Sequence, residues 1–76
     1  MTNEADMEKL AVAIGQNIRE KRRANGLSQD RFALLAGIDR SYMGRIERGE
    51  VGITIEKLYR IAAALHCEPT TLLPRM

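Results

Sequence analysis

Two short apolar segments separated by a very short turn constrain the fold of this chain more than any other feature. Residues 28–36 and 39–48 carry apolar side chains at helical spacing, and only Gly37 and Ile38 join them. Helices joined so closely must cross steeply, which needs a small side chain where they touch. Ala33 supplies that small side chain, and Ile38 can fill the gap beside the turn. The pattern therefore predicts a crossed pair of helices at about residues 28–48.

Capping residues mark where these and the following helix begin and end. Ser28, Asp39 and Thr54 each stand where an N-cap is expected, ahead of an apolar periodic segment. Gly37 and Gly49 follow the first two of these segments and can adopt the left-handed conformation that ends a helix. Three successive helices are therefore predicted from these local signals.

Apolar periodicity predicts further helices on both sides of the central pair. Before it, Leu10, Ile14 and Ile18 recur every four residues, and Gly26 follows a basic last turn. After it, one apolar stripe comprises Leu58, Ile61, Ala62 and Leu65, and a second comprises Ile55, Tyr59 and Ala63. Residues 70–73 have room for one last turn before Pro74. No segment alternates with period two, so the chain is predicted to be all-α.

Charge is distributed unevenly along the chain. The formal net charge is only +2, but three of the ten acidic residues lie in residues 1–8, so residues 9–76 carry twelve basic and seven acidic side chains, or +5. Residues 9–76 are predicted to form one domain, and their positive charge is expected to attract a polyanion. Residues 1–8 form an acidic segment that either extends the first helix or frays.

Several classes of protein are excluded by what the composition lacks. Cys67 is the only cysteine and His66 the only histidine, so neither a structural zinc site nor a disulfide within the chain is expected. No catalytic constellation or glycine-rich phosphate loop is present, so we expect no enzyme activity and no cofactor or metal. No apolar run is long enough for a membrane span, which favours a cytoplasmic protein.

Positive charge is concentrated on the second helix of the crossed pair. Residues 37–50 contain three arginines, although Met43 and Ile46 must face inward. Helical spacing then places Arg40, Ser41, Gly44, Arg45 and Arg48 on the other faces. An arginine can donate two parallel hydrogen bonds to a guanine edge, and Gly44 removes bulk that would keep the backbone from a groove. The pattern favours a helix-turn-helix that binds DNA.

The segments IREKRRANGLSQDRFALLAGIDRSYMGRIERGE and TIEKLYRIAAAL resemble the phage-repressor and Cro-like, or XRE-like, helix-turn-helix regulators. The resemblance covers roughly residues 14–73 and implies a five-helix domain whose third helix enters the major groove. The stretch DRSYMGRIERG is also similar to the small controller proteins of restriction-modification systems. The family often has a basic residue just past the glycine that corresponds to Gly49, whereas this chain has Glu50 and Val51.

The resemblance assigns roles to individual residues of this chain. The base-reading positions correspond to Arg40, Ser41 and Arg45, and the phosphate-binding candidates are Ser28, Gln29, Tyr42, Arg48 and Thr54. A structural ion pair between the first helix and the end of the third corresponds to Arg22 and Glu47. Tyr42 remains open as either a core aromatic or a phosphate contact.

The implied function is sequence-specific regulation of transcription by a homodimer on a palindromic operator, with contact to RNA polymerase or its exclusion. A two-fold dimer reads two half-sites about 34–36 Å apart. The dimer surface is expected to comprise Ile55, Tyr59, Ala63, Leu72 and Leu73, unless the tail of the chain closes over these residues. The alternative is a protein-interaction module, such as an antitoxin that holds a partner protein.

Overall fold

Four α-helices and a short 3-10 helix make up the part of the chain that the computed structural model describes, residues 4–75. They are α1 (Glu4–Ala24), α2 (Gln29–Ala36), α3 (Arg40–Glu47), α4 (Ile55–Ala64) and the 3-10 helix η1 (Pro69–Leu72). Within that range no residue lies in a strand, so the all-α prediction is confirmed. α1 includes residues 4–8 of the acidic segment, and residues 1–3 lie outside the described range.

The prediction of five helices was wrong in its count. The last turn is stabilised by hydrogen bonds from Thr71 N to Glu68 O (2.9 Å) and from Leu73 N to Thr70 O (3.2 Å), which span three residues rather than four. Only four residues separate Pro69 from Pro74, and a proline nitrogen has no hydrogen to donate. The segment is therefore too short to continue as an α-helix.

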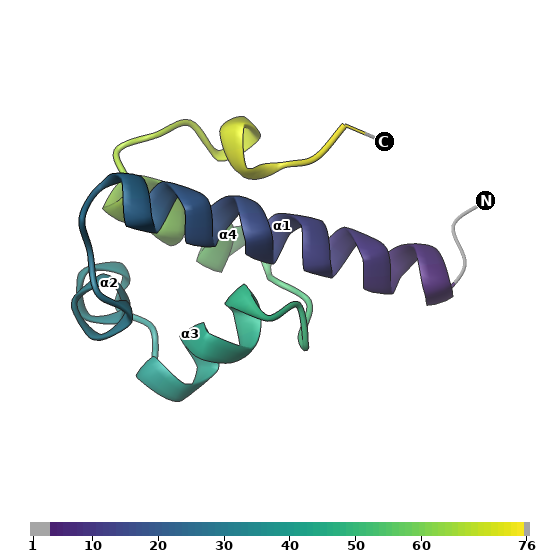
Figure 1. Ribbon diagram of the computed structural model, residues 1–76, viewed down its shortest axis with the longest axis horizontal. Coiled ribbons are helices and arrows are strands. Elements are labelled where there is room, and N and C mark those ends of the chain that lie inside the picture. Colours follow the sequence, from purple (N-terminus) through teal and green to yellow (C-terminus); the bar gives the residue numbers. More distant parts are fainter. Residues whose placement is uncertain (1–3, 76) are drawn as a thin grey trace.

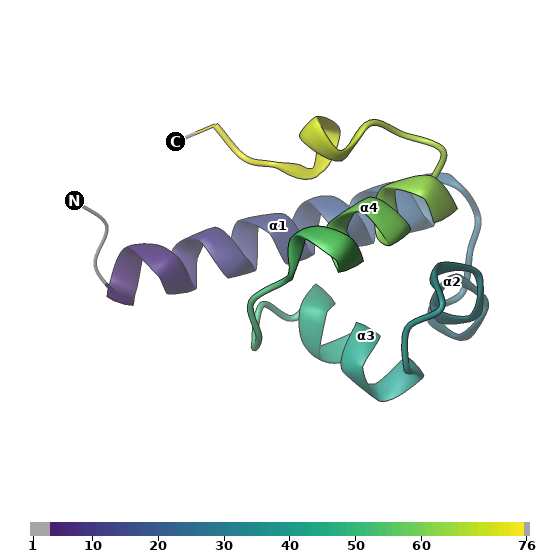
Figure 2. The same cartoon turned by 180° about the vertical axis from the view of Figure 1, so that it is seen from behind.

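α1 runs along the long axis of the molecule, with α2 and α3 on one side and the segment after α4 on the other (Figure 1). α4 lies behind α1 in this view and in front of it from the opposite side (Figure 2). The side chain of Asn17 on α1 donates a hydrogen bond to the Leu72 carbonyl of η1 (3.0 Å). This bond fixes η1 against α1.

One hydrophobic core receives side chains from every element. Its largest fully buried members are Phe32, Ile18, Met43, Ile46, Ile61, Leu65 and Leu72. Ala33 of α2 and Ile38 of the turn between α2 and α3 are also buried, as the crossing of two closely joined helices requires. The core thus holds α3 by its inner face alone.

The predicted caps at Ser28, Asp39 and Thr54 are confirmed, because each side chain accepts a hydrogen bond from the backbone nitrogen three residues later. Gly37 ends α2 with φ +68°, and its neighbour Ile38 then donates back to Ala33 O (3.0 Å). Within residues 4–75, no helix combines the length and the hydropathy needed to cross a lipid bilayer.

Candidate nucleic-acid interface

The outer face of α3 is polar and cationic. Arg40, Ser41, Arg45 and Arg48 are exposed, whereas Met43 and Ile46 on the inner face are buried. The two kinds of residue alternate at helical spacing, so burying the apolar ones necessarily turns the arginines outward. The structure therefore leaves on one helix face all three residues that the sequence assigned to base reading.

Gly44 is not the open position that the sequence suggested. It is buried, and a methyl group built on it would lie 3.1 Å from Arg48 Nη1 and 3.3 Å from Arg40 Nη1. The two flanking guanidinium groups fold over the glycine and cover its backbone. A close approach of DNA to this backbone would require both arginine side chains to move.

Each arginine of this face lies near a carboxylate. Arg40 Nε donates to Asp30 Oδ1 of α2 (2.7 Å). Arg48 Nε and Nη2 donate to the two oxygens of Glu50, and Arg45 Nε lies 3.8 Å from Glu50 Oε1. The hydrogen bond from Arg48 holds the pKa of the Glu50 carboxyl below its ordinary value, so Glu50 is ionised at neutral pH. The same hydrogen bond raises the pKa of Arg48.

A buried glutamate supports α3 from behind. The side chain of Glu47 is fully buried, and it accepts hydrogen bonds from Arg22 Nε (2.7 Å) and Nη2 (3.1 Å), while Arg19 Nε lies 3.6 Å away. The Arg22 and Glu47 pair expected from the family resemblance is thus present. Because Glu47 points into the molecule, its charge does not oppose an anion on the outer face.

The phosphate candidates divide into two groups around α3. Ser28 and Gln29 lie at the start of α2, and Gln29 Nε2 donates to Glu47 Oε1 (2.9 Å). That bond leaves Gln29 with one further N–H to offer. Thr54 caps α4, and Tyr42 is half-buried against the core with Lys57 Nζ 5.1 Å above its ring. Arg48, at the end of α3, pairs with Glu50.

Sequence reasoning missed three of these features. Asp30 and Glu50 were not recognised as partners of the arginines, although Glu50 follows Arg48 by only two residues. Lys57 was not considered, yet its cation lies over the ring of a phosphate candidate. Only the close spacing of Arg48 and Glu50 was visible in the sequence, since the other two pairs join different helices. Among the described residues, no three His, Cys, Asp or Glu side chains are placed to hold a metal ion.

The expected dimer surface is only partly exposed. Ile55 and Tyr59 of α4 are 72% and 61% exposed, Ala63 is exposed, and Leu73 is 44% exposed. Leu72, in contrast, is completely buried in the core. Its assignment to a surface was wrong, because the 3-10 turn directs Leu72 inward and its neighbour Leu73 outward. The tail therefore does not cover the stripe on α4.

Comparisons with known proteins agree on one family. The family model described as HTH_3, helix-turn-helix, matches residues 18–72. Control protein C.SmaI of Serratia marcescens is 37% identical over 62 residues, which cover 82% of this chain and 74% of that protein. Control protein C.BamHI of Bacillus amyloliquefaciens is 29% identical over 65 residues, covering 84% of this chain and 80% of that protein.

A solved structure shows the same architecture. The restriction-modification controller protein C.AhdI from Aeromonas hydrophila is 43% identical, and its crystal structure superposes with a TM-score of 0.81. The superposition covers 91% of this chain and 98% of that one. The likeness therefore extends over nearly the whole of both chains.

Proposed function

Because the chain belongs to the HTH_3, or XRE-like, family of DNA-binding helix-turn-helix transcription regulators, we propose that it works as a homodimer on a palindromic operator and controls a restriction-modification system. The observation that carries the proposal is the outer face of α3, where Arg40, Ser41 and Arg45 are exposed on a helix that the core holds from behind. Such a helix can enter a major groove without unfolding any part of the domain.

Arg40, Ser41 and Arg45 read bases in this proposal. A guanidinium that donates two hydrogen bonds to a guanine edge discriminates by about 1–3 kcal/mol against another base. Arg45 is the strongest candidate, because its 3.8 Å contact with Glu50 is looser than the 2.7 Å hydrogen bond between Arg40 and Asp30. Ser41 lies next to Arg40 in the first turn of α3, and its hydroxyl can donate a hydrogen bond to a base edge or accept one from it.

Phosphate contacts position α3 in the groove. The start of α2 presents Ser28, Gln29 and the free backbone N–H groups of a helix N-terminus, a site that favours anions. Tyr42, with Lys57 above its ring, and Thr54 at the start of α4 form the second group. Arg48 completes the set once it leaves Glu50. These contacts set orientation and affinity, and they carry no sequence information of their own.

Dimerisation through α4 supplies the two-fold symmetry of the operator. The proposed surface consists of Ile55, Tyr59, Ala63 and Leu73, and it no longer includes the buried Leu72. The dimer bound to the operator would then regulate transcription by contacting RNA polymerase or by excluding it. The protein itself performs no reaction in this scheme.

Selection of bound sequences from random duplex DNA, with the mass of the protein measured in the same buffer, tests the proposal. We expect a palindromic consensus and the mass of a dimer. Purification with a tightly bound second protein and no salt-sensitive affinity for DNA would instead indicate a protein-interaction module.

The roles within the interface are separated by two alanine substitutions. Arg45→Ala should relax specificity at one base position per half-site and cost about 1–3 kcal/mol there. Gln29→Ala should weaken binding to all sequences alike, because it removes a phosphate contact. Titrations against single-base variants of the selected operator measure both effects. A uniform loss for both substitutions would contradict the assignment of Arg45 to base reading.

A further inference from the structure

Glu50 contacts two of the three arginines on the outer face of α3. Its carboxylate accepts hydrogen bonds from Arg48 Nε (2.5 Å) and Nη2 (3.4 Å), and Arg45 Nε lies 3.8 Å from the same group. About half of the side-chain surface of all three residues is exposed. The carboxylate therefore lies at the surface where the DNA would lie.

A carboxylate engages a guanidinium with the same N–H groups that would donate to a phosphate or to a guanine edge. Arg48 cannot use its Nε–H for Glu50 and for DNA at once, and Arg45 is drawn toward the same carboxylate. We propose that Glu50 is an intramolecular competitor for DNA, which holds Arg48 and Arg45 in the free protein and lowers the affinity of the protein for both operator and unrelated sequences. This inference rests on the proposed function.

The competition acts on binding to unrelated DNA and on binding to the operator. Binding to unrelated sequence comes almost entirely from attraction between phosphates and cationic side chains. On unrelated DNA, the charge of Glu50 weakens this attraction directly, because Glu50 forms an ion pair with Arg48 and repels the DNA backbone. At the operator, Arg45 gains base contacts that discriminate by about fivefold or more, whereas an exposed ion pair resists exchange only weakly. The operator therefore displaces Glu50 as well, but breaking its contacts with Arg48 and Arg45 costs the operator complex at least as much as it costs the complex with unrelated DNA.

Asp30 is a less direct candidate for the same role. It pairs with Arg40, but it also lies in the first turn of α2, where a negative charge stabilises the helix. Substituting Asp30 would change both stability and competition. Glu50 follows the end of α3 and belongs to no helix, so its charge can be removed without disturbing one.

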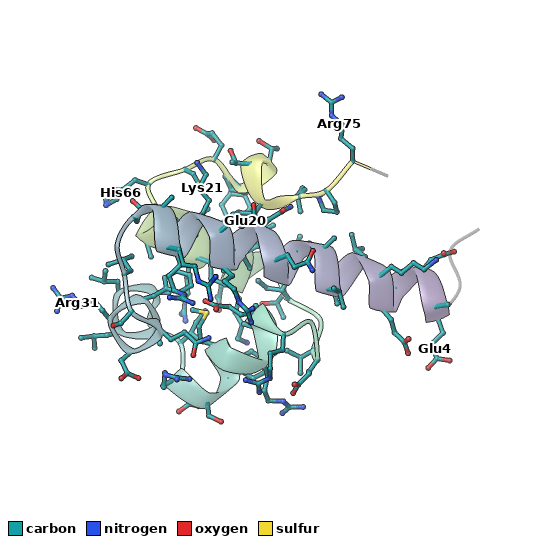
Figure 3. The ribbon with its side chains drawn as sticks, viewed as in Figure 1. Glu4, Glu20, Lys21, Arg31, His66 and Arg75 are labelled. Carbon is teal, nitrogen blue, oxygen red and sulfur yellow. The ribbon has the colours of Figure 1, made fainter. Side chains whose placement is uncertain are left out.

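Glu50→Gln removes the charge and keeps the shape of the side chain, and Glu20→Gln is its matched control. Glu20 is exposed on α1, three residues after Asn17, and so on the side that faces η1 rather than α3 (Figure 3). Both variants raise the net charge by one. A general effect of charge would therefore appear in both, and a competitive effect only in Glu50→Gln.

The measurement is affinity for a duplex carrying the selected operator and for a scrambled duplex of equal composition, each over a range of salt. We expect Glu50→Gln to bind both duplexes about two- to fivefold more tightly than wild type. The slope of log affinity against log salt should steepen by about 0.9, the value of one further phosphate contact. Glu20→Gln should match wild type within about a factor of 1.5 on both duplexes.

Arginine Nε–Hε signals in the NMR spectrum of the free protein test the ion pair itself. The Arg48 signal should shift in Glu50→Gln and stay in place in Glu20→Gln. An unmoved Arg48 signal, an equal gain in both variants, or weaker binding by Glu50→Gln would each overturn the inference while leaving the proposed function intact. Wild-type protein that binds neither duplex would overturn the proposed function, and this inference with it.

Discussion

Glu47 and Glu50 stand three residues apart at the end of α3, and both pair with arginine, yet their surroundings differ. The Glu47 side chain is fully buried and its partner Arg22 is only 12% exposed, whereas Glu50 is about half exposed. Water screens the outer pair and keeps it weak. The inner pair has lost its hydration, so removing one partner leaves a charge that nothing compensates. An arginine–glutamate ion pair therefore stabilises the fold at Glu47, whereas at Glu50 it competes with DNA for the arginines.

Glu47→Gln should lower the free energy of unfolding by about 3 kcal/mol, near the lower end for a buried pair because Arg19 and Arg22 retain some contact with water. Urea unfolding followed by circular dichroism measures the change. Glu50→Gln is the control and should unfold at the same urea concentration as wild type. A Glu47→Gln protein as stable as wild type would show that the buried pair is not needed for the fold.

At the level of elements, the sequence predicts those features that depend on residues close together in the chain. The caps of α2, α3 and α4 each join residues three apart, so Ser28, Asp39 and Thr54 could be recognised from order alone. The inward turn of Leu72 depends on the 3-10 geometry of η1, which periodicity does not specify. The bond between Arg40 and Asp30 depends on how α2 and α3 cross and on two rotamers, so it could not be predicted either.

α1 packs closely against the end of α3 at Gly15. A methyl group on Gly15 would lie 2.5 Å from the Ile46 carbonyl oxygen and 2.7 Å from that of Glu47, closer than atoms can pack. Gly15→Ala should therefore destabilise the protein by about 1–3 kcal/mol through overpacking, although alanine favours helices by about 1 kcal/mol over glycine.

Thermal unfolding measures the effect of Gly15→Ala, and Gly52→Ala is the matched control. A methyl group at Gly52 meets nothing within 4 Å and its φ is not left-handed, so this variant should melt like wild type. Because α1 holds the end of α3, Gly15→Ala should also weaken binding to the operator. An unchanged or higher melting temperature would show that α1 and α3 can separate at little cost.

At the scale of the whole molecule, one copy is insufficient for the proposed operator because it carries a single α3. The molecule measures 36 × 23 × 20 Å and has one α3, whereas half-sites on one face of DNA lie about 34–36 Å apart. In the proposed dimer, two copies related by a two-fold axis would present two α3 helices, one to each half-site. The exposed apolar residues of α4 give them a surface to share, because burying Ile55 and Tyr59 on both copies removes four large side chains from water.

Ile55→Asp should therefore convert the dimer to a monomer and weaken operator binding, since it places a charge in the shared surface. Folding should survive, because Ile55 is the first residue of α4, where a negative charge is favourable. Leu34→Asp on α2 is the control: Leu34 is 70% exposed against 72% for Ile55, but it lies outside the proposed surface. Sedimentation equilibrium should give a monomer for Ile55→Asp alone, and a dimeric Ile55→Asp protein would place the two-fold axis elsewhere.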